Sequence, residues 1–128
     1  LDLSKFKDVN DKYGHVVGDE VLKIIAERLK EVVRQNDLVA RFGGDEFLIM
    51  TYDVYSKNMS SLLNRIIHTI EKPIEIYDKT FRLSVQIGVA IFPQDGESLD
   101  ELIRVADFAM YRAKQKRISI VFYKDEKD

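Results

Sequence analysis

The chain has 128 residues, of which 45% are hydrophobic and 33% are charged, and its formal net charge is −2. This length predicts a single domain, and the hydrophobic content is too high for a disordered chain. The slightly acidic balance argues against a nucleic-acid partner, and the absence of cysteine excludes disulfides and thiolate metal sites. No apolar run reaches the ~18 residues of a membrane span, and no signal peptide is visible.

Hydrophobic periodicity predicts alternating strands and helices along the chain. Apolar stripes over residues 18–35 and 59–70 predict two amphipathic helices, and Pro73 must end the second. Residues 98–101 (Ser-Leu-Asp-Glu) form a capping box that opens a third helix. In chain order we expect an opening strand ending near residue 2, a helix over 18–35, hairpin strands over 38–41 and 46–51, a loop over 53–57, a helix over 59–70, a short strand over 74–77, a long strand over 81–91, a loop over 93–97, a helix with its stripe over 99–113 and a last strand over 118–123.

The order of these elements predicts an α+β fold. Strands and helices interleave and two hairpins are present, which favours a mixed, mainly antiparallel sheet with a ferredoxin- or palm-like βαββαβ core flanked by helices. The charged residues 124–128 are expected to form a tail or linker. The chain lacks an initiator Met and opens in a strand, so we interpret it as a fragment of a longer parent protein. We expect it to be a cytoplasmic domain of a parent that is either free or membrane-anchored.

The segment "RFGGDEFLIM", residues 41–50, places two carboxylates at a glycine turn between two strands. If the first strand neighbours this hairpin, Asp2 and Asp45 meet at one edge of the sheet, with Glu46 beside them. Carboxylates and nearby backbone carbonyls are hard oxygen ligands that suit Mg²⁺, and Mg²⁺ implies a phosphate-bearing substrate. The alternative is an ordinary solvated turn, which spacing alone favours.

The segment "NDKYGHVVGDE", residues 10–20, places polar side chains just before the first predicted helix. The amide of Asn10 and the carboxylate of Asp19 together can read the edge of guanine, which presents donors beside acceptors. The alternative is turn chemistry, with Asp19 as the N-cap. His15 is interpreted as a structural hydrogen-bonding residue and not as a catalyst. Because the chain has two histidines and no second one is nearby, we do not expect a zinc site.

Basic residues end the last predicted helix. Lys114, Lys116 and Arg117 lie at its C-terminus, where the helix dipole favours cations in any case. The same residues could clamp a polyphosphate. Spacing alone leaves both interpretations open.

Three segments together resemble the GGDEF domain, the catalytic module of diguanylate cyclases. They read "LDLSKFKDVNDKYGHVVGDEVL", "RQNDLVARFGGDEF" and "ADFAMYRAK", in that order, and the resemblance runs from Asp2 to Tyr123. It implies a single GGDEF domain over residues 1–128 with a nucleotide-cyclase-like fold. The implied reaction joins two GTP molecules into cyclic di-GMP and releases two pyrophosphates, with Mg²⁺ or Mn²⁺ as cofactor. Because each domain holds one GTP, it also implies a homodimer.

The resemblance implies roles for individual residues. Asp45 and Glu46 are the implied catalytic residues, Glu46 as a base or as a helper of the metal. The implied metal ligands are Asp2, the carbonyl of Leu3, Asp45 and Glu46; the substrate-binding residues are Asn10, Asp19, Leu22, the N–H groups of Lys5 and Phe6, Gly43, Gly44, Lys114 and Arg117; and the allosteric product site comprises Arg34, Asp37 and Arg65.

The pair Arg34 and Asp37 has a plainer interpretation as the charged exit of a helix, and either way we expect both side chains to be exposed. Three departures from the family pattern are visible. The helix that usually precedes the first strand is absent, and Ser4 stands where many members have Asp. The segment from Lys114 to Arg117 is one residue shorter than the usual Lys-x-x-Gly-Arg-Asn and lacks its Gly and Asn.

Two other functions remain as alternatives. The first is a regulatory GGDEF module that binds GTP or cyclic di-GMP with little or no turnover. The shortened segment 114–117 favours it, and so do "AIFPQDG" and "AMYRAK", which resemble GGDEF–EAL proteins. The intact motif over 43–47 favours catalysis. The second is a domain that only dimerises, which leaves the matches at Asn10, Asp19 and Arg34 unexplained. In every case we expect other domains in the parent, a sensor and, in the GGDEF–EAL type, a phosphodiesterase domain.

Overall fold

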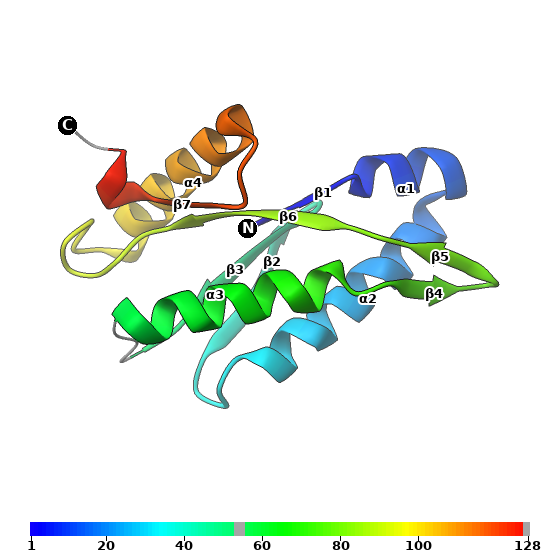
Figure 1. Cartoon of the computed structure of the whole chain (residues 1–128), viewed down its shortest axis with the longest axis horizontal. Coiled ribbons are helices and arrows are strands. Elements are labelled where there is room, and N and C mark those ends of the chain that lie inside the picture. Colours follow the sequence, from blue (N-terminus) through cyan, green and yellow to red (C-terminus); the bar gives the residue numbers. More distant parts are fainter. Residues whose placement is uncertain (53–55, 127–128) are drawn as a thin grey trace. The chain divides into compact units, whose positions relative to one another are not determined.

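The computed structural model describes residues 1–52 and 56–126, and its elements can be followed in Figure 1. These residues divide into two compact units, one formed by Leu3–Val85 and the other by Leu1–Asp2 with the chain from Gln86 onward. In chain order the elements are β1 (Asp2–Ser4), α1 (Phe6–Tyr13), α2 (His15–Val32), β2 (Leu38–Gly43), β3 (Glu46–Met50), α3 (Ser56–Glu71), β4 (Ile74–Ile76), β5 (Lys79–Phe81), β6 (Ser84–Val89), α4 (Leu99–Lys116), β7 (Ile120–Phe122) and the 3₁₀ turn η1 (Tyr123–Asp125).

The main sheet has five strands in the order β2-β3-β1-β6-β7, and β4 and β5 form a separate two-stranded sheet. Strands β2 and β3 are antiparallel, with Leu38 opposite Met50, whereas β6 and β7 are parallel, with Ile87 opposite Ile120. The fold is therefore α+β with a mixed, mainly antiparallel sheet, which confirms the predicted fold class.

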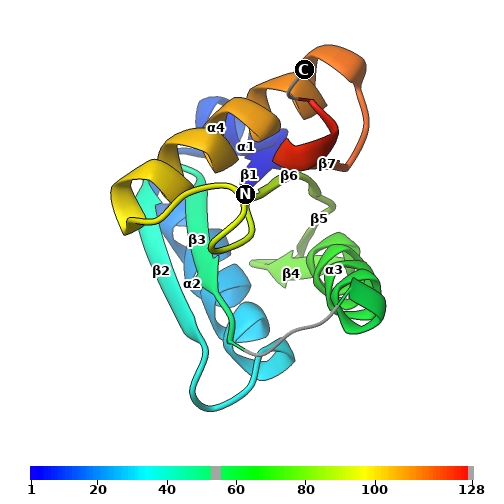
Figure 2. The same cartoon turned by 90° about the vertical axis from the view of Figure 1, so that its left-hand side faces the viewer.

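The core of the unit Leu3–Val85 is built on the two predicted helical stripes. Helix α2 packs against α3, β2 and β4, and Figure 2 shows it beside the β2–β3 hairpin. Ile25 and Leu29 on α2 and Ile70 on α3 are fully buried. Burying each such side chain contributes about 1.5–3 kcal/mol, so these faces hold the unit together.

Helix α4 belongs to the other unit and packs closely on β6. A Cβ atom placed on Gly88 would lie 2.0 Å from the carbonyl oxygen of Ala106, so only glycine allows this approach. Further along the helix, Ala109 and Ala113 have no exposed surface and pack with Val121 of β7. The small residues of α4 thus set how near the helix comes to its strands.

The predicted capping box is present in part. The Ser98 hydroxyl accepts a hydrogen bond from the Glu101 N–H at 3.2 Å, as expected for an N-cap. The Glu101 carboxylate, however, accepts from the N–H of Glu97 at 3.1 Å instead of that of Ser98. The box therefore anchors the preceding loop as well as the helix.

The predicted start of the first helix is wrong. Residues read as a turn form helix α1, and α2 begins before Gly18, so Asp19 lies inside a helix and is not its N-cap. Gly14, with φ of 89°, separates the two helices. Helix α1 buries only Phe6 and Val9, too few residues to give a recognisable stripe.

The long strand expected over residues 81–91 is divided in two. Its first part belongs to β5, which pairs with β4 and places Phe81 opposite Ile74. Tyr77 and Asp78 have φ of 50° and 66°, the left-handed pair of a tight hairpin turn. The alternation of side chains continues through the break, and for that reason the pattern did not reveal it.

Other boundaries differ by a few residues. Helix α2 ends at Val32 instead of residue 35, β7 is shorter than 118–123, and α3 begins at Ser56 within the expected loop, of which residues 53–55 lie outside the described part. Leu99, expected in the apolar stripe of α4, is 49% exposed at the start of the helix. None of the described helices is long and apolar enough to cross a membrane.

Candidate functional site

The turn between β2 and β3 carries Asp45, and Glu46 follows it as the first residue of β3. Gly43 and Gly44 have φ of 147° and 36°, which disfavours any side chain, and a Cβ atom on either would meet nothing within 4 Å. Phe47, which is 2% exposed, anchors the turn to the core. The Leu3 N–H donates to the carbonyl oxygen of Asp45 at 3.1 Å, so the first strand neighbours the turn. Open space beside the glycines leaves room for a ligand at the backbone.

Asp2 is a buried carboxylate, 7% exposed, that begins β1 instead of ending the strand as expected. Its Oδ2 forms an ion pair with Lys114 Nζ, while its Oδ1 is buried and has no hydrogen-bond partner. A buried polar atom without a partner is costly, and a cation could satisfy it. The carboxylate is therefore suited to a hard divalent cation. Over the ranges 1–52 and 56–126, no three His, Cys, Asp or Glu side chains gather into a cation site.

Lys114 and Arg117 lie at the C-terminal end of α4. The Lys114 ammonium contacts Asp2, so the residues expected at phosphate and at metal lie side by side. Arg117 is exposed and has φ of 56°, the left-handed conformation that commonly ends a helix at a glycine. The Ile118 N–H donates to the carbonyl of Ala113 at 3.1 Å, which completes this helix end.

The residues expected to read guanine lie on two successive helices. Asn10 is half-buried on α1, whereas Asp19 is exposed and Leu22 is 4% exposed on α2. A Cβ atom on Gly18 would lie 1.8 Å from the Asn10 Oδ1 atom. The sequence interpretation missed this contact, although a glycine in a helix interior is a signal for close approach.

The N–H groups expected at phosphate lie where α1 begins. Lys5 is the N-cap residue, with φ of 70°, and Phe6 is the first residue of the helix. Unpaired N–H groups and the helix dipole favour an anion at such a position. Phe6 is 5% exposed, which fixes the start of the helix to the core.

Arg34 and Asp37 pair at the exit of α2. Arg34 donates from Nε to Asp37 Oδ2 at 3.2 Å and from Nη2 to Oδ1 at 3.3 Å, and it also contacts the carbonyl oxygen of Tyr52. The Arg34 side chain is 57% exposed, but that of Asp37 is 2% exposed, so the expectation that both are exposed is wrong for Asp37. The guanidinium covers the carboxylate.

The environment of Asp37 stabilises its charged form. Burial by itself raises the pKa of this carboxyl, but hydrogen bonds from the Arg34 side chain and backbone, together with the Arg34 charge, bring the pKa below its ordinary value of 3.8. A backbone hydrogen bond from Tyr52 adds to this lowering.

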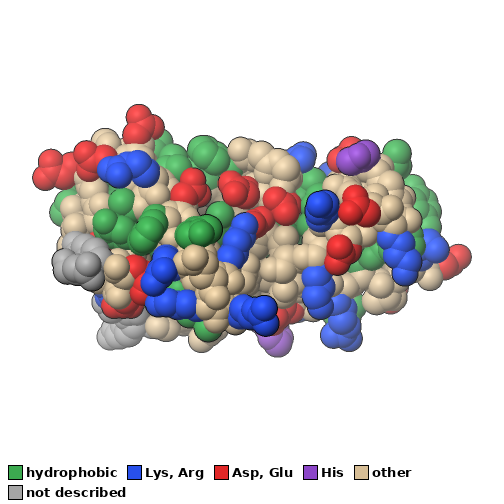
Figure 3. All heavy atoms as spheres, turned by 90° about the horizontal axis from the view of Figure 1, so that it is seen from above, with side chains coloured by type: hydrophobic (Ala, Val, Ile, Leu, Met, Phe, Trp, Pro, Cys, Tyr) green, Lys and Arg blue, Asp and Glu red, His purple; other side chains and the backbone are tan. Residues whose placement is uncertain are grey.

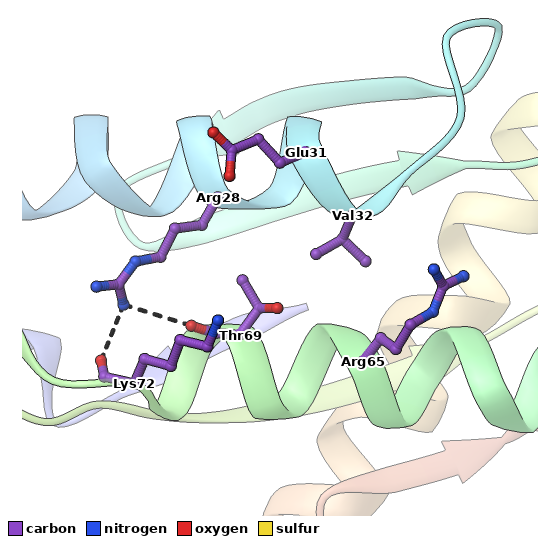
Figure 4. Close-up of a pocket in the computed structure, with 6 residues that line it drawn as sticks. All are labelled: Arg28, Glu31, Val32, Arg65, Thr69 and Lys72. Carbon is purple, nitrogen blue, oxygen red and sulfur yellow. Dashed lines mark hydrogen bonds between the residues drawn. The ribbon is translucent and has the colours of Figure 1, made fainter.

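Arg65 lines a pocket of about 370 Å³ between α2 and α3. Figure 4 shows the pocket, whose lining on the α2 side includes Arg28 and on the α3 side includes Arg65 and Thr69. Arg28 donates to the carbonyl oxygens of Lys72 and Pro73, each at 2.8 Å, and so caps the end of α3. Arg34 and Asp37 are not among the lining residues, so this pocket places Arg65 with Arg28.

Charge is mixed on the face of the molecule seen in Figure 3. On the face shown in Figure 3, Lys and Arg side chains lie among Asp and Glu side chains and hydrophobic ones. This distribution accords with the formal net charge of −2.

Comparison with known proteins identifies related chains. The family model described as "Diguanylate cyclase, GGDEF domain" matches residues 1–119. The signaling protein YkoW of Bacillus subtilis is 46% identical over 121 residues, 93% of this chain and 15% of that protein. The bifunctional diguanylate cyclase/cyclic di-GMP phosphodiesterase MucR of Pseudomonas aeruginosa is 40% identical over 116 residues, 91% of this chain and 17% of that protein. The chain thus spans a small part of the length of both relatives.

A solved structure of a GGDEF domain is also similar to this chain. The crystal structure of the GGDEF domain of YfiN (TpbB) from Pseudomonas aeruginosa matches with a TM-score of 0.88 and 36% sequence identity. The match covers 94% of this chain and 77% of that one.

Proposed function

Because the chain belongs to the GGDEF domain family of diguanylate cyclases, we propose that it condenses two molecules of GTP into cyclic di-GMP and releases two pyrophosphates. The observation that carries the proposal is the buried Asp2 carboxylate. One of its oxygens lacks a partner, and the other contacts the Lys114 ammonium. A carboxylate suited to a metal thus lies beside a cation suited to phosphate, as the reaction requires.

The proposed metal site uses oxygen ligands from β1 and from the β2–β3 turn. Asp2, the carbonyl of Leu3 and Asp45 would hold Mg²⁺ or Mn²⁺, with Glu46 assisting the metal or accepting a proton. Such a cation, when bound, offsets charge on the phosphates and lowers the pKa of the attacking 3′-hydroxyl. The positive φ values of the turn glycines keep side chains out of the way of the nucleotide.

The remaining proposed contacts bind and orient GTP. Asn10 and Asp19 would hydrogen-bond the guanine edge, and Leu22 would form an apolar wall. The N–H groups of Lys5 and Phe6 lie at a helix start, which suits phosphate oxygens. Lys114 and Arg117, from the end of α4, would neutralise the phosphates together with the glycine turn of residues 43–44.

Replacing Asp45 by Asn tests the catalytic assignment. We expect Asp45→Asn to abolish formation of cyclic di-GMP from GTP and Mg²⁺, because a neutral amide is a poor ligand for a hard cation. The fold should survive, since Asp45 lies on a turn. Asp78→Asn, which removes the same charge from the exposed β4–β5 turn, is the matched control and should keep wild-type turnover. Wild-type product formation by the Asp45→Asn protein would refute the metal assignment.

A second candidate function is regulation through the product. The exposed Arg34 guanidinium, held by Asp37, can contact a phosphate and a guanine together, and Arg65 would add a further contact. A domain with little turnover would still bind cyclic di-GMP there, in a parent protein that carries a sensor or an EAL domain.

The product site is tested by calorimetry on the isolated domain. Arg34→Ala should abolish binding of cyclic di-GMP without lowering the affinity for GTP, because the proposed sites share no residues. Arg82→Ala removes another exposed arginine from the same unit and should leave both affinities unchanged. Unchanged cyclic di-GMP affinity in Arg34→Ala would show that this arginine only ends a helix.

A further inference from the structure

Glu126 is held between two cations of helix α4. Its Oε1 accepts from Arg112 Nε at 3.0 Å, and its Oε2 accepts from Lys116 Nζ at 2.8 Å. The Glu126 side chain is 8% exposed, while those of Arg112 and Lys116 are 41% and 42% exposed. The 3₁₀ turn η1 brings Glu126 back to the helix, and the Glu126 N–H donates to the carbonyl of Tyr123 at 2.9 Å. These contacts clamp the end of the chain's last turn to α4.

The clamp and the Lys114 contact lie on different sides of the same helix. Arg112 and Lys116 are four residues apart, so they share one face. Lys114 lies two residues from each, about 200° around the helix, and its ammonium contacts Asp2. The last turn of α4 is therefore held on one side by Glu126 and on the other by Asp2.

Helix α4 ends at a residue with an unfavourable backbone conformation. Arg117 adopts a left-handed conformation with φ of 56°, and its N–H donates to the carbonyl of Lys114 at 3.3 Å. A residue with a Cβ atom is disfavoured in this conformation, whereas glycine is not. The contacts with Glu126 and Asp2 therefore add to the cap hydrogen bonds in holding this turn and, with it, Lys114.

We propose that Glu126 is a positioning residue, which by clamping Arg112 and Lys116 holds the last turn of α4 so that the Lys114 ammonium lies against Asp2. The effect on GTP rests on the proposed function, in which Lys114 contacts phosphate. Hydrogen bonds from Lys116 and Arg112 also lower the pKa of Glu126, against the effect of its burial, so the carboxylate is charged near neutral pH.

Glu126→Gln tests this role, with Asp125→Asn as the matched control one residue away on an exposed position. In Glu126→Gln we expect the hydrogen-exchange protection of the Arg117 and Ile118 amides to fall about three- to tenfold. The ¹⁵N signal of the Lys114 ammonium should shift toward that of a solvated lysine, and the GTP affinity with Mg²⁺ should fall about threefold or more. Asp125→Asn should change none of the three.

A second variant separates the contacts of Glu126 from the backbone strain at Arg117. Arg117→Gly removes the unfavourable conformation, so adding it to Glu126→Gln should restore much of the amide protection. Unchanged amide protection or an unchanged Lys114 signal in Glu126→Gln would overturn the positioning role. If the amide protection and the Lys114 signal both change but the GTP affinity does not, Glu126 positions Lys114 without affecting nucleotide binding. That result would overturn the proposed effect of Glu126 on GTP. Failure of the wild-type domain to bind GTP would instead count against the proposed function. The two NMR readouts would still test whether Glu126 positions Lys114.

Discussion

The carboxylate of Asp37 is buried by its own neighbour, Arg34, at an otherwise exposed helix end. The guanidinium uses two of its nitrogen atoms on the carboxylate, and the Arg34 N–H donates to Asp37 Oδ2 at 2.9 Å. A ligand that recognises both side chains must therefore replace part of this pairing. At the scale of single residues, the Arg34–Asp37 pair must open in part before both side chains can bind the product.

This pairing makes stability depend on acid pH. Because the folded-state pKa of Asp37 lies below its ordinary value of 3.8, the charged carboxylate favours the folded state. Its contribution is complete above pH 3.8 and is lost as the pH falls through the folded-state pKa. We expect Asp37→Asn to reduce the free energy of unfolding by ~0.5–1 kcal/mol at pH 7, since the half-exposed Arg34 limits the effect. Urea denaturation from pH 7 to pH 2 should show the difference shrinking below pH 3.8, and a constant difference would contradict this account.

At the scale of elements, the contact between α1 and α2 determines where Asn10 lies. Gly18 allows the two helices to meet, and a Cβ atom there would lie 1.8 Å from Oδ1 and 2.9 Å from Cγ of Asn10 and 3.3 Å from Cζ of Phe6, all of them side-chain atoms. We expect Gly18→Ala to leave the stability nearly unchanged, because the amide can rotate away. The GTP affinity should fall about five- to tenfold, because a guanine hydrogen bond worth ~1 kcal/mol or more is lost.

Calorimetry with GTP measures this effect, and Asn10→Ala supplies the control. In the Asn10→Ala background, Gly18→Ala should cause no further loss, since the displaced amide is already gone. Wild-type GTP affinity in Gly18→Ala would mean that Asn10 does not read the base.

At the scale of the whole molecule, the proposed reaction needs two chains. Each domain would hold one GTP, so two domains must face each other before either 3′-hydroxyl can attack. We expect the rate of cyclic di-GMP formation per protein to rise with protein concentration until the dimer is saturated. Rates measured over a hundredfold dilution, with sedimentation in parallel, test this. A rate strictly proportional to concentration from a chain that sediments as a monomer would contradict it.

The sequence patterns that predicted structure correctly are those in which neighbouring residues of one short segment determine its conformation. The stripe that includes Ile25 and Leu29 and the glycine turn at 43–44 each follow from a period or a backbone conformation that neighbouring residues impose. Helix α1 was missed because two buried residues make no period, and the break after Phe81 was missed because alternation persists through it.

The sequence by itself determined the fold class, the two stripes of α2 and α3, the glycine turn and the family, because each rests on local spacing or on an ordered set of motifs. Tertiary structure alone decided that Asp37 is covered, that Lys114 contacts Asp2 and that Glu126 pairs with Arg112 and Lys116. The last two contacts join residues from distant parts of the chain or from beyond a helix end, where no periodic pattern reaches. Such contacts depend on how packed elements bring side chains together, and this packing cannot be predicted from the spacing of residues along the chain.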